Sequence, residues 1–143
     1  MQSGSIGATL NDMDSLQNSP ITADDLLARA RAMAPALRMR EDAAETARQV
    51  SAQTIAEMRD AGLFRAFQPV RYGGYELDPD LLLRMGTELA RGCGSSAWIG
   101  NLAMVHQWMI AGFPEQAQDD IWGDTATGNA DAIALGTYAA AAE

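Results

Sequence analysis

The sequence predicts an all-α fold, a helical bundle, on three observations. Apolar residues recur at helical spacing in successive segments, and capping residues, Gly and Pro separate these segments. Aromatic residues make up only 6% of the chain, so Ala, Leu, Ile and Met must form most of the interior. With 143 residues, 48% of them hydrophobic, the chain is large enough to bury a core of its own and is not a disordered polymer.

The first helix is predicted to begin after Thr22, because Asp25 three residues later completes a capping box. Pro35 lies inside the helical pattern, which predicts either a kink or two abutting helices before Val50. The charged run from Arg38 to Arg48 has the spacing of ion pairs on a solvated helix face.

The next helix is predicted to begin at an N-cap formed by Ser51 and to end at Gly62, followed by a connecting loop over 63–77. Pro79 is expected at the first position of a helix that stops at Gly92. A final short helix is expected from Pro114 to Ile121 or Trp122.

A long helix is predicted from about Ser95 to Phe113, with Ser95 or Ser96 as its cap. Apolar residues point in all directions around it, which is typical of a helix in the middle of a bundle. We therefore expect Trp98 and Trp108 to pack in the core. The apolar stretch is too short, and contains too many polar residues, for a membrane span.

The chain is divided into three parts on these patterns. Residues 1–20 form a flexible N-terminal arm, and residues 21–127 form the helical bundle. Residues 128–143 are either the truncated start of a β domain or a disordered tail, because residue types that could start a strand occur between Ile133 and Tyr138. The arm lacks a positive run followed by an apolar core, so it is not a secretory signal.

Charge and composition exclude several functions. The net charge is -9 and the isoelectric point about 4.4, which excludes a general attraction to nucleic acid or to an anionic membrane. All ten basic residues are arginine, so no lysine can form a Schiff base. The single cysteine, Cys93, cannot form an internal disulfide, and with the single histidine, His106, it is too few ligands for a Cys/His zinc site. The lack of a disulfide fits a reducing compartment, so we expect a cytoplasmic protein.

Two features have a functional and a structural interpretation. Gly92, Gly94 and Ala97 match a dinucleotide-binding pattern, but they follow a helix instead of a strand, so we interpret them as a helix end and a turn. His106 is the only side chain that can exchange protons near neutral pH without a shifted pKa. Periodicity alone places it on an apolar helix face, where a core histidine with a partner is the simpler interpretation.

Several segments resemble enzymes of the acyl-CoA dehydrogenase fold. The stretch EMRDAGLFRAFQPVRYGG at 57–74 resembles a helix and loop of this family. Further similar segments are TELARGCGSSAW at 87–98, VHQW at 105–108 and FPEQAQDDIWGD at 113–124, and these look more like its flavin-dependent monooxygenase branch. The resemblance covers about residues 22–138.

The resemblance implies that this is the N-terminal helical domain, which precedes a β domain and a C-terminal helical bundle in a homo-oligomer. Such enzymes hydroxylate a small aromatic substrate with reduced FMN or FAD supplied by a partner reductase. The resemblance also implies that His106 is the catalytic base, that Trp98 and Leu102 bind the substrate, and that Thr137 lies near the flavin. We expect no tightly bound flavin on these residues alone.

Two alternatives remain open from the sequence. The first is the N-terminal domain of an acyl-CoA dehydrogenase, whose catalytic glutamate would lie outside these residues. The second is a non-catalytic helical module that oligomerises or binds a partner through an exposed apolar surface.

Overall fold

Five α-helices and two short 3-10 helices form residues 20–123, the part of the chain that this computed structural model describes. They are α2 (Ala23–Ala47), α3 (Ala52–Asp60), η1 (Leu63–Arg65), η2 (Val70–Tyr72), α4 (Leu81–Ala90), α5 (Gly94–Ala111) and α6 (Glu115–Trp122). Residues 20–123 contain no strand, which confirms the predicted all-α fold. The predicted arm, apart from Pro20, and the predicted strand near Thr137 lie outside the described residues.

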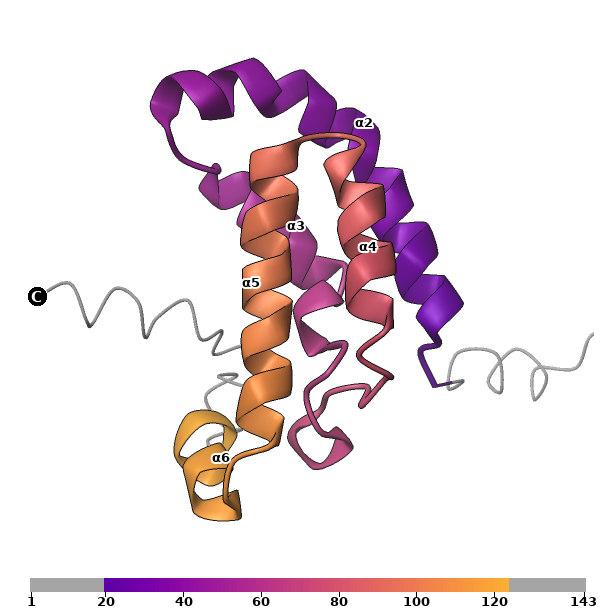
Figure 1. Ribbon diagram of the computed structural model, residues 1–143, viewed down its shortest axis with the longest axis vertical. Helices are drawn as coiled ribbons and strands as arrows, with labels where there is room; N and C mark the ends of the chain where they lie inside the picture. Colours follow the sequence, from indigo (N-terminus) through magenta and orange to yellow (C-terminus); the bar gives the residue numbers. More distant parts are fainter. Residues whose placement is uncertain (1–19, 124–143) are drawn as a thin grey trace, which may run out of the picture.

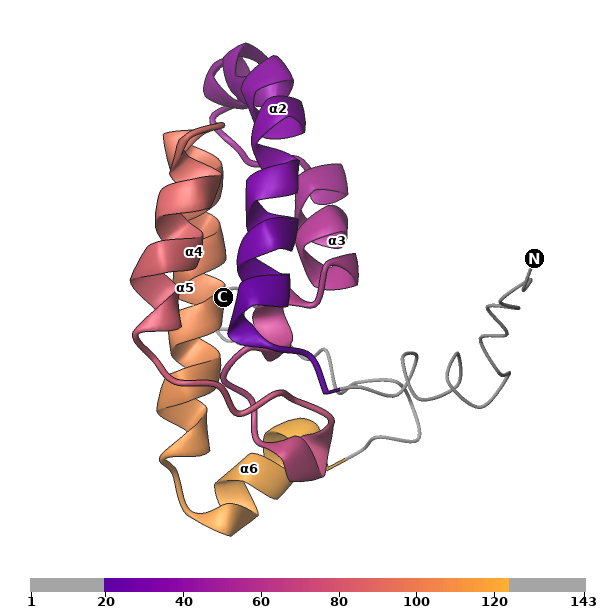
Figure 2. The same ribbon diagram turned by 90° about the vertical axis from the view of Figure 1, so that its right-hand side faces the viewer.

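The helices are arranged around α4 and α5, which lie side by side and are joined by a tight turn (Figure 1). Helix α2 packs along α4, and α5 contacts α3 and η1 on its inner side. Figure 2 shows α2 between the α4–α5 pair and α3, with α6 at the far end of α5. None of the described helices has the length and hydropathy that crossing a bilayer requires.

The N-terminus of α2 is fixed by the predicted capping box. The Asp25 backbone N–H donates to the Thr22 hydroxyl at 3.2 Å, and the Thr22 N–H donates to the Asp25 carboxylate at 2.9 Å. Pro35 lies inside a single continuous helix, and this helix bends along its course (Figure 1). The kinked helix, not a pair of separate helices, is therefore the outcome.

One predicted helix start and one predicted helix cap are wrong. Helix α4 begins at Leu81, because Pro79 belongs to a turn in which the Leu81 N–H donates to the Asp78 carbonyl at 3.1 Å. Helix α5 begins at Gly94 with Cys93 as its N-cap, and no side chain caps it. Ser95 and Ser96 are thus already inside the first turn. The predicted Ser51 cap, the left-handed Gly62 and Pro114 before α6 are confirmed.

The core forms where α2, α4 and α5 meet. Its fully buried side chains come from five elements and include Leu26, Leu37, Met58, Leu63, Leu81, Met85, Leu89 and Met104. Small residues let the helices approach closely. A Cβ atom on Gly92 would lie 2.4 Å from the Ala34 carbonyl oxygen, so the α4–α5 turn packs directly on the α2 backbone.

Arginines connect helices that are distant in sequence. The Arg40 guanidinium donates to the Thr54 hydroxyl at 2.8 Å and to the Glu57 carboxylate, which joins α2 to α3. It also donates to the Ala36 carbonyl at 3.2 Å. The charged run of α2 is therefore not only a solvated face, as its spacing predicts, because one of its arginines belongs to a helix contact.

We predict that Gly92→Ala and Gly94→Ala have opposite consequences, although both replace a glycine of the same turn. In Gly92→Ala the added Cβ atom meets the α2 backbone, which cannot move freely. This clash should lower the free energy of unfolding by roughly 1–3 kcal/mol. In Gly94→Ala the added Cβ atom has no other atom within 4 Å outside its own helix and chain neighbours. Gly94→Ala should therefore be neutral or stabilise by up to about 1 kcal/mol. Urea denaturation of both variants checks this, and equal effects would contradict it.

Acid sensitivity should depend on Glu88. Its carboxylate accepts a hydrogen bond from Arg31 at 2.9 Å, which lowers the pKa of Glu88 despite the opposing effect of burial. A lowered folded-state pKa stabilises the fold above the unfolded-state pKa, and this stabilisation is lost as the pH falls through the folded-state pKa. Glu88→Gln should therefore flatten the acid limb of a plot of unfolding free energy against pH. An unchanged slope would contradict the prediction.

Candidate functional site

The candidate site lies on the outward side of α5. Trp98, Leu102 and His106 follow each other at intervals of four residues, so the helix places them in one line. Trp98 is 66% exposed, whereas Leu102 and His106 are half-buried. The Nδ1 atom of His106 is itself buried. The structure therefore brings together the three predicted residues that it describes, and Thr137 lies outside the described residues.

Exposed apolar side chains occur along the length of α5. Besides Trp98, they are Trp108 and Met109 of α5 and Phe113 just after it, each 50% exposed. The prediction of a helix buried all round, with Trp98 and Trp108 in the core, is therefore wrong. The physical reason is that α5 buries only one face, which includes Ala97, Gly100 and Met104, so that apolar side chains on its other faces stay exposed.

Three contacts fix the rotation of α5. The Asn101 amide occupies the space above Gly86 of α4, where a Cβ atom would lie 2.3 Å from Asn101 Nδ2. Gly100 faces Met58 and Leu89. A Cβ atom on Gly100 would lie 3.3 Å from the nearest side-chain atom of each. Buried Gln107 accepts a hydrogen bond from Trp122 Nε1 at 3.1 Å. Together these contacts fix which side of α5 carries Trp98, Leu102 and His106.

Helix α6 supports the C-terminal half of α5 through a second, smaller core. Trp122 is fully buried and its ring centroid lies 5.3 Å from that of Tyr72. The Tyr72 hydroxyl donates to the Asp119 carboxylate, and burial together with this hydrogen bond raises the pKa of Tyr72. The Tyr72 hydroxyl is thus a hydrogen-bond donor within this smaller core, and its buried ring is not part of the exposed surface of α5.

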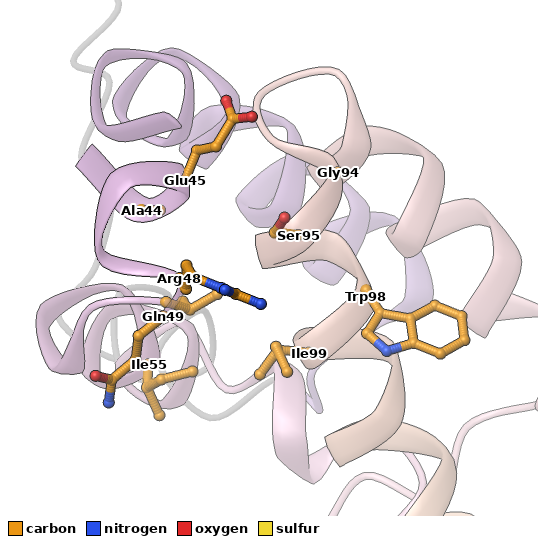
Figure 3. Close-up of a pocket in the computed structure, with 10 residues that line it drawn as sticks. Ala44, Glu45, Arg48, Gln49, Ile55, Gly94, Ser95, Trp98 and Ile99 are labelled. Carbon is orange, nitrogen blue, oxygen red and sulfur yellow. The ribbon is translucent and has the colours of Figure 1, made fainter. Parts of the chain in front are cut away.

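A pocket of about 750 Å³ opens beside the N-terminal end of the same line (Figure 3). It lies between the end of α2, the start of α3 and the first turns of α5. Its lining is formed by Ala44, Glu45, Arg48, Gln49, Val50, Ile55, Gly94, Ser95, Trp98 and Ile99. Trp98 therefore belongs both to the pocket and to the predicted site.

Arg48 is a functional candidate that the sequence pattern does not reveal. It is the C-cap of α2 and adopts a left-handed conformation with φ 53° and ψ 33°, which is unusual for a residue other than glycine. The spacing of the charged run assigns it to a solvated face. The signal that could have identified it is its place directly after the last helical turn, where a left-handed residue is common.

The described residues suit one wall of an aromatic site, but they do not form a complete flavin site. The apolar outward side of α5 can cover a flat ring, and Arg48 is the sole cation lining the pocket beside it. A flavin phosphate normally requires several convergent donors, and no such cluster lines this wall. Within 20–123 no group of three His, Cys, Asp or Glu side chains could hold a metal ion.

The fold and this wall define a helical domain of the kind that flavoenzymes of the acyl-CoA dehydrogenase fold carry at their N-terminus. The family model described as "Acyl-CoA dehydrogenase, N-terminal domain" matches residues 23–127. The chain therefore belongs to this family.

The relatives of the chain are oxygenase components. It is 37% identical over 93 residues to the flavin-dependent monooxygenase oxygenase subunit HsaA of Rhodococcus jostii, a match that covers 65% of this chain and 24% of that protein. It is 36% identical over 114 residues to the oxygenase component of an FADH(2)-dependent resorcinol hydroxylase of Rhizobium, with 80% and 27% covered. The crystal structure of the HsaA monooxygenase from M. tuberculosis has a TM-score of 0.70 and 34% identity, with 73% and 28% covered. The chain thus spans about a quarter of the length of these relatives.

Exposure of two tryptophans can be tested directly. In a double variant, Trp98→Gln with Trp108→Gln, the free energy of unfolding should change by no more than about 0.5 kcal/mol, because neither ring is in the core. Binding of an apolar fluorescent dye should fall because the apolar surface is reduced. Trp122→Phe is the matched buried control and should destabilise by at least about 1 kcal/mol. Strong destabilisation by the double variant would contradict the exposed placement.

Proposed function

We propose that the chain is the N-terminal part of the oxygenase component of a two-component flavin-dependent monooxygenase, and that the whole protein hydroxylates an aromatic substrate. The observation that carries this proposal is the single imidazole, His106, which is half-buried two helical turns from the exposed Trp98 along α5. The names of the relatives support it, since they are oxygenase components and not dehydrogenases. These names therefore favour a monooxygenase over the alternative hypothesis of an acyl-CoA dehydrogenase.

In this proposal His106 accepts the proton of a substrate hydroxyl. A neutral imidazole has one acceptor nitrogen and is the side chain best suited to take a proton near neutral pH. Removal of the proton raises the electron density of the aromatic ring and makes it a better nucleophile. Trp98 and Leu102 contribute apolar surface that excludes water from the ring. The flavin, held mainly by residues outside those described, supplies the oxygen-transfer chemistry.

The cofactor and partners follow from the same proposal. A separate reductase supplies reduced flavin, and the FADH(2)-dependent relative favours FAD over FMN. The exposed apolar side of α5 is covered in the whole protein by further protein surface, and we propose a homo-oligomer. The same surface is what a non-catalytic interaction module would use, so activity is the property that separates the two functions.

Replacing His106 by Ala in the full-length protein should lower hydroxylation by roughly 10²–10⁴-fold, because a positioned base is lost. Turnover is measured with chemically reduced flavin, which removes any dependence on the reductase. Raising the pH should partly restore the His106→Ala rate, since the free substrate then loses its proton without a base. His106→Asn, which keeps a polar side chain but accepts no proton, should behave like His106→Ala. Unchanged turnover in either variant would remove the catalytic role.

A further inference from the structure

The pocket beside Trp98 has the character of a ligand site. Its volume of about 750 Å³ lies within the range of roughly 300–1,000 Å³ that small-molecule sites occupy. Apolar side chains from α2, α3, α5 and the segment between α2 and α3 line it, including Ala44, Val50, Ile55 and Ile99. A mostly apolar cavity with a few polar groups is the usual form of a site that binds an organic molecule.

One cation is directed into this pocket. In Figure 3 the Arg48 guanidinium points toward α5, between Ser95 and Ile99, whereas the Glu45 carboxylate points away from them. Among residues 20–123 no carboxylate forms an ion pair with Arg48, in contrast to Arg31, Arg38 and Arg40. Arg48 holds this place with a left-handed backbone that glycine would adopt at lower cost. Its donors are therefore available to an acceptor on a ligand.

The pocket continues the line of the candidate site. Trp98 lines the pocket, and His106 lies eight residues further along α5, about 12 Å away at the helical rise. Half-buried Leu102 lies between them on the same side. A molecule that contacts both His106 and Arg48 must therefore be longer than one aromatic ring.

We propose that this pocket is the distal part of the substrate site, and that it selects an elongated phenol whose far end carries a carboxylate. This assignment rests on the function proposed above. The hydroxyl lies at His106, the apolar body lies along Leu102 and Trp98, and the carboxylate binds the Arg48 guanidinium. Arg48 is then a specificity-determining residue that discriminates by charge and by substrate length.

The test measures binding to the 143-residue chain without flavin or turnover. The probe is ω-(p-hydroxyphenyl)octanoic acid, and the comparisons are its neutral primary amide and the short p-hydroxyphenylpropanoic acid. Isothermal titration should show that the long acid binds about tenfold or more tightly than its amide. In a ¹H–¹⁵N spectrum the long acid should shift the Trp98 indole resonance and leave that of buried Trp122 in place.

Two variants separate a specific contact from a general charge effect. Arg48→Met should weaken binding of the long acid about tenfold or more and leave that of the amide unchanged. Arg84→Met, on α4 and outside the pocket lining, removes the same charge and should leave both affinities unchanged. Arg48→Lys should retain part of the preference for the acid.

Several results would overturn the assignment. It fails if acid and amide bind alike, if Arg48→Met and Arg84→Met have equal effects, or if the short acid binds as tightly as the long acid. It also fails if no probe shifts the Trp98 resonance. Because none of these readouts involves hydroxylation, loss of the His106 role in turnover and loss of the Arg48 contact are distinguished.

Discussion

The close approach of α4 to α5 decides which side of α5 faces outward. Asn101 lies on Gly86, and Gly100 lies against Leu89 and Met58, so the two helices meet where side chains are smallest. A rotation of α5 by one residue, about 100°, in either direction would place a larger side chain, Ile99 or Asn101, where Gly100 now meets Leu89 and Met58. Since α5 is apolar on all sides, hydrophobicity alone would not select one rotation. The shape of this contact does, and the line from Trp98 to His106 follows from it.

Local signals in the sequence predicted most of the helix ends. Thr22 with Asp25, Ser51, Gly62 and Pro114 act through hydrogen bonds or backbone angles within a few residues, and such effects are visible in a short window of sequence. The start of α4 was misplaced because proline at the first helical position and proline in a preceding turn look alike in sequence. Only the turn hydrogen bond distinguishes them.

The placement of Trp98 and Trp108 could not be predicted in the same way. Periodicity shows which residues are apolar, but not which neighbouring element covers them. The linear arrangement of Trp98, Leu102 and His106 did follow from their four-residue spacing. The pocket did not, because it depends on a left-handed residue, Arg48, that turns the chain from α2 into α3 beside the first turns of α5.

The basic residues of this domain also bear on how it can be modified. Arg40 donates to three acceptors at once, a geometry that the planar guanidinium provides and a single ammonium group does not. With every basic side chain an arginine, the chain carries no side-chain amine. Enzymes that acetylate or ubiquitinate lysine therefore find no side-chain substrate in these 143 residues, and amine-directed crosslinkers can react only with an α-amino group.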